Sequence, residues 1–184
     1  MGNTSQMKLR PLKLVDQEPA LQAHHELMLE NWEFLLNSFT EQEPWGDFLE
    51  RLENERKGKN LGPGRVAATF LVAEVEGQIV GRVSIRHTLN EYLAQIGGHI
   101  GYGIRPAFRR KGYATQILRQ SLVIANSLGI ESALLTCDEE NLGSARTIEK
   151  CNGILVSKVQ DSEGILKRRY WVPTTLLTSL DPTT

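Results

Sequence analysis

The feature that most constrains the fold is an amphipathic segment between two segments that read as strands. Apolar residues recur at helical spacing along one face of residues 113–128. Gly129 follows directly, and a glycine just past the last turn is typical of a helix end. Residues 96–105 and 132–137 on either side read as β-strands. A helix between two strands predicts a sheet that is covered by helices, in a layered α/β or α+β domain.

The rest of the chain adds hairpins and helices to this unit. Two β-rich segments, 69–75 and 78–87, are separated by Glu76-Gly77 and predict a hairpin, and a second hairpin is expected near the end of the chain. Asn141 stands where a helix N-cap is expected. The other expected elements are a strand at 8–15, helices over 19–39 and 45–57, and strands at 154–159 and 165–172. The expected order is βααβββαβαββ.

The composition excludes several functional classes. The chain has 184 residues with 21 basic and 22 acidic side chains, so no global positive field exists to hold nucleic acid or an anionic membrane. No apolar run reaches the roughly 20 residues that cross a bilayer, which predicts a cytoplasmic protein. Cys137 and Cys151 lack zinc-ligand spacing, so we expect reduced thiols and no metal. We expect a single domain over residues 1–184.

A basic loop joins the strand at 96–105 to the helix at 113–128. Arg109, Arg110 and Lys111 directly precede Gly112, where the helix is expected to begin. The first amides of a helix lack partners, and the helix dipole adds positive charge at this end. The pattern therefore predicts a phosphate site on the amides of residues 112–115. The alternative is a solvated basic turn.

Two familiar nucleotide-binding motifs are missing, and another pattern is present. Pro106 stands where a dinucleotide fingerprint needs its third glycine, and no G-x-x-x-x-G-K sequence occurs. The R-x-x-G-x-A pattern of Arg109, Gly112 and Ala114 instead resembles the pyrophosphate-binding motif of the GCN5-related N-acetyltransferase (GNAT) superfamily. Residues 141–150 with Gly153 resemble its second cofactor segment. Residues 98–102 resemble a poorly characterised bacterial branch of predicted acetyltransferases.

The resemblance implies a fold and a co-substrate. The fold would be a mixed, mostly antiparallel central sheet with helices on both faces. Acetyl-CoA would be the co-substrate, with its pantetheine arm between the strands at 98–105 and 132–137, and no metal is implied. Asn141 would contact this arm or cap its helix. The residues expected at the cofactor are Ile104, Arg109, Arg110, Lys111, Gly112, Tyr113, Ala114, Thr115, Asn141 and Ser144.

Acetyl transfer to an alkyl amine needs a base, because only the neutral amine attacks. An amine with pKa about 10.4 is deprotonated at pH 7 at a cost of about 4.6 kcal/mol. His99 is the first candidate, since strand alternation puts it on the face of Gly101 and Gly103; a hydrogen-bonded histidine within a buried strand is the alternative. His87 and Glu91 are the other candidates.

The general acid and the substrate are less constrained. Many relatives have a tyrosine where this chain has Ile148, so Tyr102 is the alternative donor, although it could simply pack in the sheet. The predicted activity is direct acetyl transfer, in a ternary complex, to the primary amine of a small molecule or peptide; the alternative is a CoA-binding module without turnover. The chain would be a monomer or homodimer. An acceptor pocket or simple helix packing would explain Trp32, Trp45, Glu41, Glu43 and Asp47.

Overall fold

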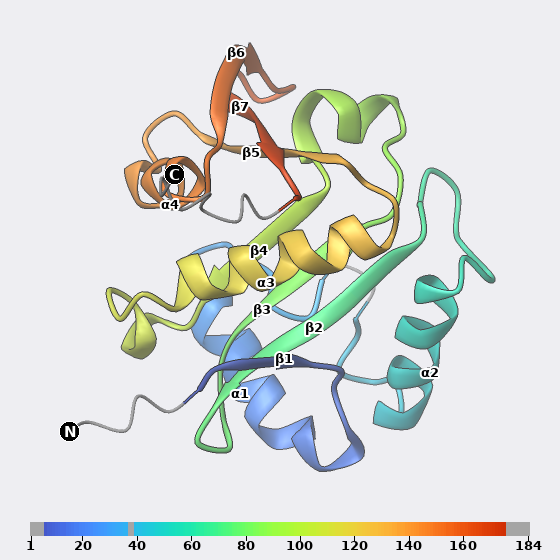
Figure 1. Ribbon diagram of the computed structural model, residues 1–184. Helices are drawn as coiled ribbons and strands as arrows, with labels where there is room; N and C mark the ends of the chain where they lie inside the picture. Colours follow the sequence, from blue (N-terminus) through green and yellow to red (C-terminus); the bar gives the residue numbers. More distant parts are fainter. Residues whose placement is uncertain (1–5, 37–38, 176–184) are drawn as a thin grey trace, which may run out of the picture.

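The computed structural model describes residues 6–36 and 39–175, and its element order is the predicted one (Figure 1). Within these residues, no helix has the length and apolar character needed to cross a membrane. The strands and main helices are β1 (Lys8–Arg10), α1 (Gln17–Met28), α2 (Trp45–Arg56), β2 (Ala68–Val75), β3 (Gln78–Arg86), β4 (Ile100–Ile104), α3 (Tyr113–Ser127), β5 (Ser132–Asp138), α4 (Leu142–Glu149), β6 (Ile154–Gln160) and β7 (Leu166–Pro173).

The strands form two antiparallel sheets. The first has the order β1-β2-β3-β4 and the second has the order β5-β7-β6. Within the described residues, β4 pairs only with β3 and β5 pairs only with β7, so no ladder there joins the two sheets. Figure 1 shows α3 lying across the first sheet, with the second sheet and α4 above it. The predicted mixed α/β class is confirmed, and its sheet is divided between β4 and β5.

Two apolar cores lie on opposite faces of the first sheet. β2 shows this directly, because Leu71 and Ala73 pack with α3, whereas Phe70 and Val72 pack with α1 and α2. Successive side chains of a strand point to opposite faces, so a strand that is buried on both faces contributes to both cores. The helices therefore cover both faces of the sheet.

Three predicted boundaries are wrong. The strand expected at 8–15 ends at Arg10, before Pro11, and Leu14–Asp16 forms a short 3-10 turn. The helix expected over 19–39 ends at Met28. The backbone then turns through Asn31, whose φ is +56°. The strand expected at 96–105 begins at Ile100, because Leu93–Gly97 forms a π-helical turn. Contacts from distant residues, described below, account for the last two differences.

Candidate cofactor and acceptor site

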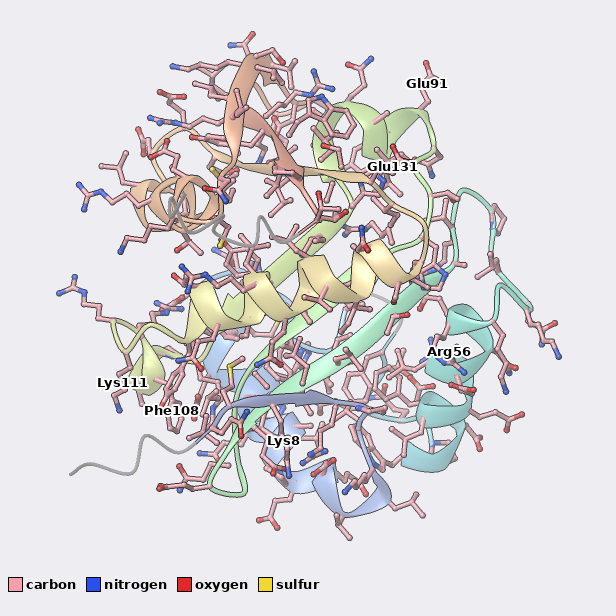
Figure 2. All side chains as sticks on the ribbon, viewed as in Figure 1. Lys8, Arg56, Glu91, Phe108, Lys111 and Glu131 are labelled. Atoms are coloured by element: carbon pink, nitrogen blue, oxygen red, sulfur yellow. The ribbon has the colours of Figure 1, made fainter. Side chains whose placement is uncertain are left out.

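The N-terminus of α3 is an uncapped helix start. Gly112 precedes the helix with a left-handed φ of +81°, and a Cβ at this position would meet nothing within 4 Å. No side chain caps the helix, and the amides of residues 113–115 have no hydrogen-bond partner within the described part of the chain. Figure 2 shows Phe108 and Lys111 at this end of α3. The helix start therefore has free amide donors, and the anion site expected there stays a prediction.

The three cations of the basic loop differ in their partners. Arg109 donates to the carbonyl of Ile104, 3.1 Å away, and its guanidinium pairs with Glu30. Arg110 and Lys111 are exposed and form no ion pair with any described residue; the ammonium of Lys111 lies 5.3 Å from the ring of Phe108. Two of the three predicted cations are thus available to a ligand, whereas the Arg109 side chain already has a carboxylate.

The hydrogen-bonded ladder is interrupted between β4 and β5, and we call this interruption the gap. The two segments meet at the closed end of the gap, where the His99 amide donates to the carbonyl of Leu134 at 2.7 Å. Thr136 Oγ1 also donates to the carbonyl of Ile96 at 2.5 Å. Beyond these contacts, β4 has a strand partner on one side only. The backbone of residues 100–104 therefore presents an unpaired edge, to which an extended ligand can hydrogen-bond.

The start of α4 lies beside this gap. Asn141 caps the helix, because its side-chain oxygen accepts from the amide of Ser144 at 3.0 Å. The capping role predicted for Asn141 is confirmed. The hydroxyl of Tyr102, on β4, lies 3.1 Å from the Ser144 hydroxyl. Burial raises the pKa of Tyr102 to about 12, so the phenol is protonated at neutral pH. Ile148 is fully buried in the core of this face.

His99 lies at the closed end of the gap, and its ring is engaged. Nδ1 accepts a hydrogen bond from the amide of Leu134 at 2.9 Å, so the neutral ring carries its proton on Nε2. Burial, with a smaller contribution from the Arg86 charge, lowers the pKa of His99. The side chain thus holds β4 against β5 in the neutral form. This arrangement corresponds to the alternative that the sequence left open, a hydrogen-bonded histidine at the base of the strand.

The other two candidate bases lie away from the gap. His87 bonds through Nε2 to the hydroxyl of Thr69, at 2.8 Å. Burial and the nearby charge of Arg56 lower the pKa of His87. Glu91 is exposed, and in Figure 2 its side chain projects from the molecule far from Lys111 and the start of α3. The structure therefore does not bring the three candidate bases together.

The face of the gap opposite α3 contains residues that sequence reasoning missed. Arg82 is buried and donates to the carbonyls of Glu33, Phe34 and Gly101. Its guanidinium lies 4.0 Å from the centre of the Trp32 ring. Trp32 in turn covers Gly103, where a Cβ would lie only 2.3 Å from the indole. These contacts hold the segment after α1 against β4 and explain why α1 ends early.

The acidic residues predicted for an acceptor pocket either pair with basic side chains or are exposed on α2. Glu41 pairs with His25, and Glu43 pairs with Arg51. Asp47 is exposed on α2, while Trp45 packs in the core of α1 and α2. Of the predicted acceptor residues, only Trp32 contacts β4. The alternation of Arg82, Ser84 and Arg86 in β3 is the signal that would have indicated a polar face at this position.

Comparisons with known proteins agree with this arrangement. The family model described as an acetyltransferase (GNAT) domain matches residues 6–153. No curated protein sequence matches the chain. RimJ of Mycobacterium smegmatis, solved with CoA disulfide, is 17% identical with a TM-score of 0.69, covering 92% of this chain and 83% of that chain.

Two further solved structures share the fold. An N-acetyltransferase from Staphylococcus aureus Mu50 is 16% identical with a TM-score of 0.62, covering 93% of this chain and 100% of that chain. The microcin C7 self-immunity acetyltransferase MccE, solved with acetyl-CoA and AMP, is 17% identical with a TM-score of 0.63, covering 91% of this chain and 92% of that chain. At these identities, the likeness is one of fold.

Proposed function

The chain belongs to the family of GNAT acetyltransferase domains, and on that premise we propose that it is an N-acetyltransferase that acts on the primary amine of a small molecule or peptide. Acetyl-CoA is its co-substrate and supplies the acetyl group together with the thiol that leaves. The structures of RimJ with CoA disulfide and of MccE with acetyl-CoA support this assignment.

The open start of α3 is the observation that carries the proposal. Its uncapped amides and the left-handed Gly112 form a concave anion site, and Arg110 and Lys111 add two cations without carboxylate partners among the described residues. A pyrophosphate matches both the unpaired donors and the positive end of the helix dipole. The residues present therefore fit the diphosphate of CoA. Arg109 contributes by shaping the loop, since its guanidinium is held by Glu30 and Ile104.

The pantetheine arm is proposed to lie along the unpaired edge of β4. An amide-containing chain in this gap can pair with the backbone of residues 100–104 as an additional strand would. An edge N–H near Ile104 is proposed to stabilise the oxyanion that forms when the amine attacks. Asn141 and Ser144 lie beside the same gap at the start of α4.

Direct attack in a ternary complex sets different demands on acid and base. A thiol with pKa about 8.5 leaves almost without protonation, so Tyr102 need only donate a hydrogen bond to the departing sulfur. The amine, by contrast, has to lose a proton. His99 can accept that proton only by releasing the Leu134 amide from Nδ1. The base therefore stays a prediction, which variants of His99 test.

Turnover distinguishes an enzyme from a CoA-binding module. The experiment incubates the purified chain with acetyl-CoA and a panel of primary amines, follows released thiol, and measures CoA affinity separately by calorimetry. We expect CoA binding and thiol release that depends on one or more amines. Binding without release above the spontaneous rate for every amine would favour the module, and absence of CoA binding would overturn the cofactor assignment.

A further inference from the structure

Three arginines on the face opposite α3 lack a carboxylate partner. Ile85 of β3 and Tyr170 of β7 point into the core beneath α3, so Arg86 and Arg169 next to them point to the other face. Arg82 lies on the same face of β3 as Arg86. Among residues 6–36 and 39–175, none of the three forms an ion pair. For Arg82, which is buried, this is unusual, because buried charges are normally paired; Arg86 and Arg169 are half-buried.

Arg86 and Arg169 hold the same short turn. Arg86 donates through Nη1 to the carbonyls of Gly97 and Gly98, at 3.1 and 3.2 Å. Arg169 donates to the carbonyl of Ala94 at 2.6 Å and to the Ser157 hydroxyl at 2.9 Å. Both guanidinium groups therefore meet the end of the turn that leads into β4. Carbonyl dipoles satisfy these donors but do not neutralise two full charges.

Both groups also keep donors that the protein does not use. Nε of Arg169 is buried and has no hydrogen-bond partner. Nε and Nη2 of Arg86 have none among the described residues. Arg86 reaches β4 itself, since its Nη1 lies 3.6 Å from the place where a Cβ on Gly101 would stand. Among the described residues, only Nε of Arg169 is a buried side-chain donor without a partner. A buried unpaired donor is costly, so this N–H favours a ligand acceptor close to it, and the unused N–H groups of Arg86 add further donors.

The electrostatic surroundings favour an anion at this place. Burial lowers the pKa of Arg82 to about 9 and also lowers that of Arg86, which shows how little water compensates these charges. The carboxylates that reach them electrostatically are those of Glu33 and Glu55. Neither pairs with an arginine of this group, and Glu55 is occupied by Arg65. The positive charge is therefore left for a ligand to neutralise.

We propose that the acceptor amine carries an anionic group, a carboxylate or a phosphate, that binds Arg86 and Arg169 while its amine faces the open edge of β4. A guanidinium presents two parallel N–H donors, which matches both kinds of oxyanion. This proposal rests on the proposed function, because it assigns the acceptor side of the same gap. It differs from an acceptor pocket lined by Glu41, Glu43 and Asp47, whose carboxylates would suit a cationic molecule.

Matched acceptors test the proposal by kinetics. Leucine, phenylalanine and glutamate are each compared with the corresponding α-carboxamide, and O-phosphoethanolamine is compared with ethanolamine. We expect kcat/KM to be at least tenfold higher for the anionic member in either the carboxylate or the phosphate arm. The amine of the carboxamide is less basic, so a larger fraction of it is neutral and able to attack. Its intrinsic reactivity therefore opposes a preference for the carboxylate. Equal or better use of the uncharged members overturns the proposal.

Variants test whether the preference for anionic acceptors depends on these arginines. Arg86→Gln should reduce it at least tenfold, chiefly through KM, with CoA affinity within twofold of wild type; an unchanged preference contradicts the proposal. Arg56→Gln is the matched control, since Arg56 is an arginine on α2 that pairs with Glu53, and it should change nothing. Thermal melting accompanies each variant because Arg86 also holds the turn. If Arg86→Gln does not fold, Arg86→Lys and Arg169→Gln make the same test, with a smaller loss expected for the lysine.

A binding measurement separates this inference from the proposed function. With CoA saturating the start of α3, orthophosphate and acetate are titrated at constant ionic strength while the fluorescence of Trp32 and Trp171 is followed. Saturable binding that weakens at least tenfold in Arg86→Gln supports the anion site even if no amine is acetylated. Absence of both saturable binding and anionic preference overturns the site. Turnover with uncharged amines alone would support the proposed N-acetyltransferase activity and reject the anion site.

Discussion

The two faces of the gap between β4 and β5 are built from different parts of the chain. The face next to α3 uses backbone groups, namely the amides of residues 113–115 and the open edge of β4. The opposite face uses side chains, including Arg82 and Trp32, that come from β3 and from the segment after α1. Backbone groups are the same for every residue type, so the first face suits a ligand common to a family. The second face suits a ligand particular to this chain.

Gly112→Glu should break the α3 face alone. It places a carboxylate among the amides that would hold the diphosphate, and it forces a side chain into a left-handed conformation. We expect CoA affinity to fall by about 100-fold, equivalent to about 2.7 kcal/mol. Isothermal calorimetry measures the change.

Gly112→Asn is the matched control for this substitution, because asparagine tolerates the left-handed region and adds no charge. It should weaken CoA several times less than the glutamate does. Unchanged affinity in Gly112→Glu would remove the start of α3 from the cofactor site.

His99 stands where the two faces meet, and its variants test whether it holds the gap or acts as the base. His99→Ala leaves the buried amide of Leu134 without an acceptor and should reduce the free energy of unfolding by about 1–3 kcal/mol. His99→Asn places an amide oxygen near the position of Nδ1 and should retain most of the stability and turnover. Urea unfolding and thiol release provide the two measurements. Loss of turnover by 100-fold or more in a stable His99→Asn variant would support His99 as the base.

The same ring gives stability a pH dependence. Because the folded-state pKa of His99 lies below the unfolded value of about 6.5, protonation favours the unfolded chain. The free energy of unfolding should therefore decrease as the pH falls from 7 through the lowered pKa. His24 and His87, whose pKa values burial also lowers, add to this decrease. His99→Asn should show a shallower decrease than wild type, and identical slopes would rule out His99 as a contributor.

Asn141→Ala should have the smallest effect, because it changes one capping bond at the edge of the α3 face. Loss of the bond to the Ser144 amide should cost about 1 kcal/mol of stability. Asn141→Asp keeps a capping oxygen and should remain near wild-type stability. A weaker CoA affinity in both variants, with stability retained in the aspartate, would add a cofactor contact to the capping role. No change in either quantity for the alanine would reject both roles.

Local patterns predicted the α3 face well. Helix α3 follows from its apolar stripe, and the Asn141 cap follows from one residue and its position. The anion site expected from Arg109 to Ala114 stays a prediction. Each of these depends on residues within a few positions of one another. A short motif was therefore enough to indicate most of this face.

The opposite face depends on contacts that no local pattern contains. Trp32 was expected on a helix. Its segment is instead held by Arg82, about fifty positions later in the sequence, which donates hydrogen bonds to the carbonyls of Glu33 and Phe34. The strand expected from residue 96 is likewise replaced by a turn that Arg86 and Arg169 hold. Side-chain donors on other strands override the β-forming pattern of Ile96. The hydrogen bond from the Leu134 amide that engages His99 therefore could not be derived from alternation alone.

Gly98 lies at the closed end of the gap, where the backbones of the two strand segments come into contact. Its φ is +65°, and a Cβ would lie 2.6 Å from the carbonyl oxygen of Leu134, so only a glycine lets the two backbones touch. β4 and β5 diverge from this contact. A side chain added at Gly98 would push the two strands apart by an amount that grows with distance along them. The missing side chain at Gly98 therefore fixes the point from which the two strands separate.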